Sequence, residues 1–387
     1  MNLQYCQTIP GVQLALQQLA HWPPVVEEII AVQQIAAPTF EEGARAAYVQ
    51  ARMEAVGLQS VQRDALHNVY GFHAGNGHGP TLLISAHLDT VFPNTTDLKV
   101  QRLGDRVYGP GIGDNSTGVA GLLRLAEVIA KHNLPHTGDI WFVANVGEEG
   151  LGDLRGMRAV VDRFNDQLDA VIVIEGCDFG TIYHQAIGVR RYRIAVETPG
   201  GHSWGDFGTP SAIHELVQLA AHLTTIPVPN EPRTTFNIGM IEGGTSVNTI
   251  AQHANLLLDM RSADINALQE LIAHVDRIVW SARNRDVRIN VTTVGDRPAG
   301  AIPRDHPIVQ IVTAAYHTVG APVSYHQGST DANIPLSRGI PAVCIGLTDG
   351  GNAHRTDEYI EPATLGRGLQ AALLMLLALT TPDPTSG

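Results

Sequence analysis

The most constraining feature of this sequence is a set of apolar, strand-like runs that each lead into a His, Asp or Glu side chain. The runs and the side chains that follow them are residues 81–86 with His87 and Asp89, 140–146 with Glu148 and Glu149, and 171–174 with Glu175. In open α/β sheets, ligands bind beyond the carboxyl ends of the strands, so these side chains should converge on one crevice. The sequence therefore predicts a polar site at one edge of a sheet.

Two further residues fit the same pattern. Asp114 follows the glycine-rich turn 109–113, and His354 follows the apolar run 342–347. The turn is not a dinucleotide-binding loop, because Asp114 stands where the third glycine would be required. Each residue alone has a plainer explanation: Asp114 as a helix cap, His354 as a surface residue, and His87 as a buried, hydrogen-bonded histidine. Together, His, Asp and Glu are the ligand types that suit zinc and related divalent ions.

Composition narrows the range of partners. The chain has 387 residues, a formal net charge of -13 and no dense Lys or Arg run, which favours two domains and argues against nucleic acid or a membrane surface as partner. The three cysteines form no C-x-x-C pair, so we expect neither disulfides nor a thiolate metal site. Residues 1–5 show no targeting pattern and the apolar run 371–379 is short, so we expect a cytoplasmic protein with a small substrate.

The order of expected elements indicates two kinds of domain. Helical spacing over residues 25–56, with Thr39 and Glu42 as a capping box, precedes strand and helix segments that alternate, which is typical of a mostly parallel sheet covered by helices. After residue 187 the pattern becomes β-α-β-β-α-β, the order of a ferredoxin-like α+β domain. We therefore predict an α/β catalytic domain at 1–187 and 298–387, interrupted by an inserted domain at 188–297.

The ordered motifs resemble those of the M20 family of metallopeptidases and N-deacylases over nearly the whole chain. The motifs are H-x-D at His87, the glycine-rich turn with Asp114, Glu148-Glu149, Glu175 after a strand, and H-x-x-x-E starting at His354. The resemblance implies two Zn²⁺ ions per subunit, with Co²⁺ or Mn²⁺ as alternatives. The implied roles are His87 and Glu175 as ligands of one ion, His354 and Glu149 as ligands of the other, Asp114 as the bridge, Glu148 as general base and Asp89 as the acid beside His87.

The resemblance extends to the inserted domain, which it implies to be a dimerisation or lid domain of a homodimer. It implies that His202, in the segment 199–203, reaches a neighbouring active site and stabilises the oxyanion. It also implies substrate binding by Asn248 and Arg261, the latter suited to a carboxylate, and by Gly328 and Ser329. A further implication is a cis peptide bond between Asp114 and Asn115.

The sequence thus predicts a dinuclear zinc amidohydrolase that cleaves a peptide or N-acyl amide bond in a small substrate with a free carboxylate. Glu at position 175 resembles carboxypeptidases and deacylases of the family, whereas the segment 200–205 resembles members grouped with tripeptide aminopeptidases. A tripeptide or dipeptide aminopeptidase is therefore the alternative enzyme. A catalytically inactive binding protein is a further alternative, although such a protein would be expected to lose the base, and Glu148 is present.

Overall fold

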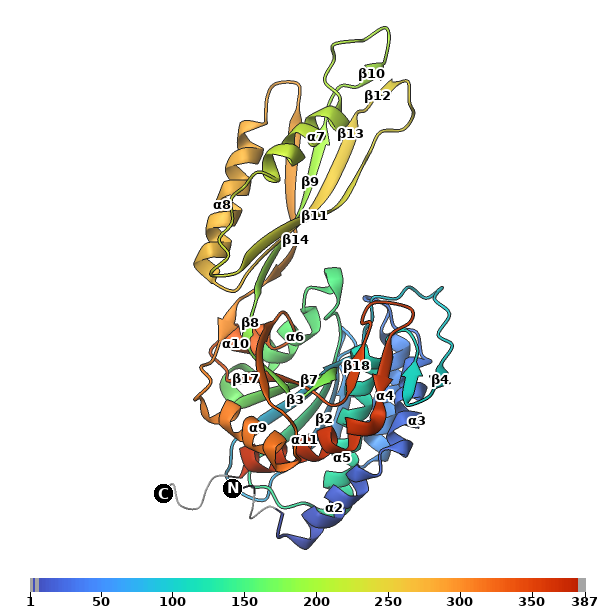
Figure 1. Ribbon diagram of the computed structural model, residues 1–387, viewed down its shortest axis with the longest axis vertical. Helices are drawn as coiled ribbons and strands as arrows, with labels where there is room; N and C mark the ends of the chain where they lie inside the picture. Colours follow the sequence, from blue (N-terminus) through green and yellow to red (C-terminus); the bar gives the residue numbers. More distant parts are fainter. Residues whose placement is uncertain (1–2, 4–6, 382–387) are drawn as a thin grey trace. The chain divides into compact units, whose positions relative to one another are not determined.

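The computed structural model describes Leu3 and Gln7–Thr381, and the chain divides into two compact units (Figure 1). The first unit comprises the chain through Ala186 and from Gly300 onward, and the second comprises Ile187–Ala299. The predicted α/β class with an inserted α+β domain is confirmed. Residues 1–2 and 4–6, which include part of the segment considered for targeting and one of the three cysteines, lie outside the described residues.

A nine-stranded sheet forms the centre of the first unit, in the order β1-β2-β6-β3-β7-β17-β8-β15, with β16 beside β8. Its four middle strands run parallel: β6 (Ile140–Asn145), β3 (Leu82–His87), β7 (Ala170–Phe179) and β17 (Ala342–Gly346). The outer strands are β1 (Gln59–Arg63), β2 (Val69–His73), β8 (Thr181–Ala186), β15 (Gly300–Ala301) and β16 (Ser324–Gly328). The carboxyl ends of the parallel strands therefore meet at one edge, as the sequence predicts.

Helices cover both faces of this sheet, which explains why its middle strands are continuously apolar. On one face Ile84 and Phe142 are fully buried in a cluster with α2, α3, α4, α5, α9 and α11. On the other face Leu83 and Val143 are buried in a cluster with α6 and α10. The helices are α2 (Pro10–Ala20), α3 (Pro23–Gln33), α4 (Gly43–Ala55), α5 (Gly118–His132), α6 (Arg155–Phe164), α9 (Pro307–Thr318), α10 (Asn333–Ser337) and α11 (Leu365–Thr380).

The C-terminal helix is apolar on nearly all sides because it lies in this core. Within the described residues, Pro362–Thr380 has the length and hydropathy of a membrane span, but 72% of its most apolar window is buried. Leu369 and Leu373 are fully buried in the large cluster. These features are typical of a core helix. The cytoplasmic location stays a prediction.

The predicted capping box at the start of α4 is wrong. Among the described residues no side chain caps the start of this helix, and the Glu42 carboxylate instead accepts hydrogen bonds from the Phe40 amide and from Arg155. The Thr39 hydroxyl donates to Asp89 at 3.0 Å. Tertiary contacts with a buried carboxylate and an arginine, which the local sequence does not reveal, have replaced the local cap.

The second unit is an antiparallel sheet in the order β11-β13-β9-β14, with α7 and α8 packed on one face. Alternate residues such as Ile194 and Leu256 are buried under Leu216 and Val275 of the helices. A separate ladder joins β10 to β12. The elements are β9 (Gly188–Glu197), β10 (Gly201–His202), α7 (Ala212–Leu223), β11 (Thr234–Gly243), β12 (Thr249–Ile250), β13 (His253–Ser262), α8 (Ile265–Ser281) and β14 (Arg288–Arg297).

A small four-stranded sheet, which the sequence does not predict, completes the first unit. Its order is β18-β19-β5-β4, and it joins two distant parts of the chain through the pairing of β5 with β19. The strands are β4 (Gln101–Leu103), β5 (Arg106–Tyr108), β18 (Asp349–Gly351) and β19 (Tyr359–Glu361). This sheet supports the loop between β18 and β19, which carries His354.

Candidate metal centre

Three strands of the main sheet bring polar side chains to the same edge. His87 is the last residue of β3, and Glu148 and Glu149 follow the end of β6. Glu175 lies within β7 rather than after it, because β7 continues to Phe179. Of these four side chains, those of His87, Glu148 and Glu149 are buried and that of Glu175 is partly exposed.

Asp114 reaches this edge from the segment Ile112–Thr117 before α5, a turn in which Asp114 and Asn115 have non-helical backbone angles. The predicted cis peptide bond between Asp114 and Asn115 is present. The Asn115 carboxamide donates to the Ile174 carbonyl at 2.8 Å and accepts from the Gly118 amide, so the turn is fastened to β7 immediately before Glu175.

His354 is positioned by a loop rather than by a strand of the main sheet. It lies in the loop between β18 and β19 with a φ of 67°, a left-handed conformation that is uncommon for a non-glycine residue and concentrates at functional sites. Its side chain is 54% exposed, whereas that of His87 is 1% exposed. The two histidines therefore enter the site from a buried strand and from an exposed loop.

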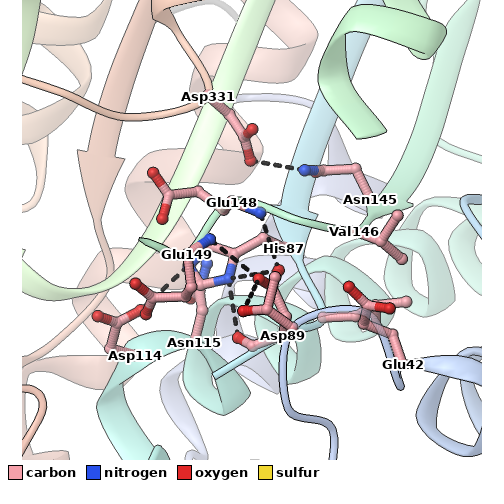
Figure 2. Close-up of polar contacts among 12 residues, drawn as sticks. Glu42, His87, Asp89, Asp114, Asn115, Asn145, Val146, Glu148, Glu149 and Asp331 are labelled. Atoms are coloured by element: carbon pink, nitrogen blue, oxygen red, sulfur yellow. Dashed lines mark hydrogen bonds and ion pairs between the residues drawn. The ribbon is translucent and has the colours of Figure 1, made fainter. Parts of the chain in front are cut away.

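Two triplets of ligand-type atoms share Asp114. Figure 2 shows Asp114 close to His87 and Glu149. His87 Nε2 lies 3.0 Å from one Asp114 carboxylate oxygen and 3.4 Å from Glu175. His354 Nε2 lies 3.1 Å from the other Asp114 oxygen and 3.3 Å from Glu149. Within each triplet, one ligand atom per residue lies within 4.8 Å of the others. A third triplet joins His87 to Glu148 and Glu149.

Asp89 fixes the backbone of this site. It is fully buried, and its two carboxylate oxygens accept hydrogen bonds from the amides of Glu148 (3.0 Å) and Glu149 (2.9 Å). His87 Nδ1 lies 3.0 Å from the Asp89 carbonyl oxygen and 3.6 Å from its carboxylate. Asp89 therefore positions the Glu148-Glu149 turn as well as the His87 ring.

Glu358 plays the corresponding part for the Asp114 turn. Its carboxylate accepts hydrogen bonds from the amides of Gly111 at 3.0 Å, Gly113 at 2.7 Å and Asp114 at 2.7 Å. Burial raises the pKa of Glu358 to about 7, against the effect of these amide donors. The motif H-x-x-x-E contains this residue, but nothing in the sequence assigns it to the glycine-rich turn.

The carboxylates of the site experience both burial and mutual repulsion. Burial raises the pKa of Glu149 to about 7, and the neighbouring Asp114 and Glu148 charges act in the same direction against the His354 hydrogen bond. Burial likewise raises the pKa of Glu175 to about 7, against the attraction of His87. One carboxylate in each half of the cluster therefore resists ionisation in the metal-free protein.

The pKa values of the two histidines are also raised, whereas that of Asp114 is lowered. Hydrogen bonds with Asp114 and Glu149 raise the pKa of His354 to about 10. Burial opposes protonation of His87, but the Glu175 charge and hydrogen bonds with Asp114 outweigh it and raise the pKa of His87 well above its usual value. Burial is likewise outweighed at Asp114, where the two histidines hold the pKa below its usual value.

These observations fit bound divalent cations. Asp114 Oδ1 and Glu149 Oε1 are buried and have no well-aligned hydrogen bond within the described part of the chain, and they lie opposite His87 Nε2 and His354 Nε2 at 3.0 Å and 3.3 Å. Buried oxygens of this kind normally have a partner, and adjacent buried carboxylates require a compensating positive charge. The donor set of imidazole nitrogens and carboxylate oxygens suits zinc or a related ion.

His202 and Asn248 lie together within the second unit. His202 pairs with Thr249 in the β10–β12 ladder, and the Ser203 amide donates to the Asn248 carbonyl at 3.0 Å. The His202 side chain is exposed, and its Nδ1 accepts hydrogen bonds from the amides of Trp204 and Gly205. This arrangement leaves Nε2 as the ring nitrogen that can donate to a ligand.

Arg261, at the end of β13, lies on the sheet face that α7 and α8 leave uncovered. Its Nε donates to Asp259 at 2.6 Å, and Arg191 donates to the same carboxylate at 2.8 Å. Burial is outweighed at Asp259 by these arginines, which hold its pKa below the usual value. Arg261 remains 43% exposed and has five donors in all, so an additional anion can still be bound.

The loop that carries the predicted substrate-binding residues Gly328 and Ser329 also contains Asp331, which forms a buried hydrogen-bonded pair that the sequence does not reveal. Gly328 ends β16, and Ser329 follows in the loop to α10. Asp331 of this loop is fully buried and accepts a hydrogen bond from Asn145, the last residue of β6 (Figure 2). An acid three residues after Gly328 carries no recognisable spacing signal, because its partner is distant in sequence.

Comparison with known proteins agrees with this geometry. Residues 83–378 match peptidase family M20/M25/M40. The chain is 28% identical over 287 residues to a putative succinyl-diaminopimelate desuccinylase from Mycobacterium tuberculosis, covering 72% of this chain and 77% of the relative. It is 24% identical over 324 residues to carboxypeptidase G2 from Pseudomonas sp., covering 81% of this chain and 77% of the relative.

Solved structures show the same fold at lower identity. A tripeptidase from Staphylococcus aureus matches with a TM-score of 0.77 and 22% identity, covering 92% of this chain and 98% of that one. The YXEP protein of Bacillus subtilis, described as a dinuclear metal-binding peptidase of family M20, matches with a TM-score of 0.68 and 16% identity, covering 94% and 99%. The chain therefore belongs to peptidase family M20/M25/M40 and is a metal-dependent hydrolase of peptide or amide bonds.

Proposed function

We propose that the protein is a dinuclear zinc amidohydrolase that cleaves a peptide or N-acyl bond next to a free carboxylate. The observation that carries the proposal is the pair of metal-ligand triplets that share Asp114. His87 and Glu175 would hold one ion, His354 and Glu149 the other, and Asp114 would contact both. Two such ions supply Lewis-acid activation of a water molecule and of the scissile carbonyl group.

Glu148 is the proposed general base. Hydrogen bonds to Asp89 fix the backbone at Glu148 and Glu149, so the adjacent side chains have defined directions. Glu149 lies 3.3 Å from His354, which suits a ligand. Glu148 would accept a proton from the attacking water and return it to the leaving amine, a role that contributes about 10²- to 10⁴-fold in rate.

Arg261 and Asn248 are the proposed binding groups for the substrate carboxylate. A guanidinium binds carboxylates with paired hydrogen bonds, and Asp259 occupies only part of its donor set. The desuccinylase and carboxypeptidase relatives support a substrate of this class, since both names describe removal of a group from a molecule that carries a carboxylate. Acylated amino acids and small peptides are therefore the proposed substrates.

The test is a competition among an N-acetyl-dipeptide, a free dipeptide and a dipeptide amide, with zinc, cobalt or manganese supplied. The proposal predicts turnover of substrates with a free carboxylate and an acylated amine, and poor turnover of the amide. A strict requirement for a free α-amine would instead establish an aminopeptidase. That result would refute the carboxylate proposal and leave the two-metal proposal intact.

A homodimer through the inserted domain is also proposed. β11 is an edge strand on which Met240 and Ile241 are 58% and 54% exposed, and α7 carries the exposed Ile213 and Val217. An unpaired edge strand and exposed apolar side chains both favour association. Sedimentation should show that Ile241→Asp dissociates the dimer, while the matched control Leu103→Asp, on an exposed strand of the first unit, does not.

His202 is proposed to donate a hydrogen bond to the oxyanion in the partner subunit, an effect worth about 3 to 4 kcal/mol at other enzymes. Glu148→Ala and His202→Ala proteins should each be inactive, and mixing them should restore activity once subunits have exchanged. Exchange followed by mass spectrometry, without any recovery of activity, would show that His202 does not act across subunits.

A further inference from the structure

A buried carboxyl group at Asp331 has no role in the function proposed above. Its residue is fully buried, Oδ2 accepts a hydrogen bond from Asn145 Nδ2 at 2.6 Å, and Oδ1 has no hydrogen-bond partner in the described part of the chain. Asn145 Oδ1 is likewise buried and finds no hydrogen-bond partner among the described residues. This pair of side chains therefore contains one hydrogen bond and two unsatisfied oxygen atoms.

The Asn145–Asp331 hydrogen bond joins two segments that are far apart in sequence. Asn145 ends β6, and its carbonyl accepts from the Leu88 amide at 2.7 Å, so it lies against the segment that carries His87 and Asp89. Glu148 follows Asn145 by three residues. The Asp331 carbonyl accepts from the Ile334 amide at 3.2 Å, which holds Asp331 at the start of α10. The bond thus connects the Glu148 turn to the loop of Gly328 and Ser329.

The surroundings of Asp331 favour its neutral form. No ion pair reaches it from the described residues, and a buried charge without a cation is costly. Burial, and next the negative charge of Glu148, raise the pKa of Asp331 well above its usual value. The other titratable groups that act on it or respond to it are His87 on β3, Glu175 on β7 and Cys344 on β17.

We propose that Asp331 is a positioning residue that works as a neutral acid, fastening the Gly328–Ser329 loop to the end of β6 through Asn145. A proton on Asp331 makes the carboxyl group both donor and acceptor, as the carboxamide of Asn145 already is. The neutral acid also adds no second negative charge beside Glu148. This role rests on the proposed function, since Glu148 and the loop are placed in the site there.

The first test compares Asp331→Asn, which keeps a neutral donor and acceptor, with Asp331→Ala. A misplacement of about 1 Å at a catalytic group can lower the rate on the order of 100-fold. We expect Asp331→Ala to lose activity on that order with unchanged metal content, and Asp331→Asn to stay within about 3-fold of the parent. Asn145→Ala should match Asp331→Ala, and the double variant should add little, because both changes remove the same contact.

The second test needs no substrate. A carboxyl group whose folded pKa is raised contributes stability below its unfolded pKa, near 4, and loses that contribution as pH rises. Asp331→Asn does not titrate, so its Tm relative to the parent should increase steadily from pH 5 to pH 8. Hydrogen exchange of residues 328–333 and 145–149 should accelerate in Asp331→Ala and not in Asp331→Asn.

The outcomes separate this proposal from the proposed function. Failure of the parent protein to hydrolyse any of the substrates would refute the proposed function, while the Tm and exchange comparisons would still decide the state and the contact of Asp331. Equal loss of activity in Asp331→Asn and Asp331→Ala would show that the negative charge is required. A Tm difference that is flat or falls with pH, or exchange rates unchanged in Asp331→Ala, would overturn the proposal.

Discussion

The two halves of the candidate metal centre have the same ligand chemistry and different support. His87 is 1% exposed at the end of a central strand, with its Nδ1 held 3.0 Å from the Asp89 carbonyl. His354 is 54% exposed on the β18–β19 loop. Each histidine faces Asp114 and one glutamate, Glu175 in the first half and Glu149 in the second. The difference teaches that ligand sets of the same chemistry can be held by supports of different rigidity. The two sites should therefore differ in their affinity for metal ions.

The largest expected effect concerns the residue next to both halves. Glu148→Ala should leave two metal ions bound and lower kcat by about 10²- to 10⁴-fold, because the proposed base is not a ligand. Glu148 also belongs to the third triplet, with His87 and Glu149, so the variant distinguishes a base from a metal ligand. Elemental analysis beside kinetics provides the measurement, and loss of an ion would assign Glu148 to the metal.

Replacing the two histidines should have unequal effects on metal content, because one is buried and the other lies on an exposed loop. His354→Ala should lose one equivalent of metal and keep the other, because the buried half does not depend on the exposed loop. His87→Ala should release both, since Asp114 is shared and the buried imidazole holds it at 3.0 Å. Metal titration by calorimetry measures this. Equal losses in the two variants would remove the distinction between the halves.

A smaller effect is expected from the carboxylate that supports the Glu148-Glu149 turn. Asp89→Asn replaces one acceptor oxygen with a donor opposite a backbone amide and should weaken metal binding about 10- to 100-fold. Thr39→Val is the matched control, because it removes one donor to Asp89 and leaves the turn contacts intact, at about 0.5 to 1.5 kcal/mol. Equal effects of the two changes would contradict the turn-positioning role.

The smallest effect is a pH dependence common to both halves. Glu149 and Glu175 have pKa values raised to about 7, so below that pH protons compete with metal at both sites. The raised values stabilise the metal-free fold at low pH, and this contribution is lost as pH rises toward 7. The gain in Tm on adding zinc should therefore grow between pH 6 and pH 8. A gain that is independent of pH would show that these carboxylates are ionised before metal binds.

The sequence predicts the part of the centre that lies on the main sheet because buried parallel strands are short apolar runs with polar ends. His87 and the Glu148-Glu149 pair follow this rule directly. The inserted domain is predictable for a related reason, since the alternation of buried and exposed residues along β9 matches a sheet with one covered face.

The supporting contacts could not be predicted, because each joins residues far apart in sequence. Glu358 binds the amides of Gly113 and Asp114, and Asp331 pairs with Asn145. The failed capping box has the same origin: Thr39 has the residue type of a cap, yet a buried carboxylate 50 positions away receives its hydrogen bond. Local patterns identify donors and acceptors, and only the tertiary fold selects their partners.

The two points where the inserted domain leaves the first unit are hydrogen-bonded neighbours. Ala186, at the end of β8, pairs antiparallel with Gly300, at the start of β15. Two strands in that register form the base of a hairpin, which a short turn could close. Removal of residues 187–299, or their exchange for another domain, would therefore leave this strand pairing of the first unit geometrically complete, so the junction is a suitable position for an engineered fusion.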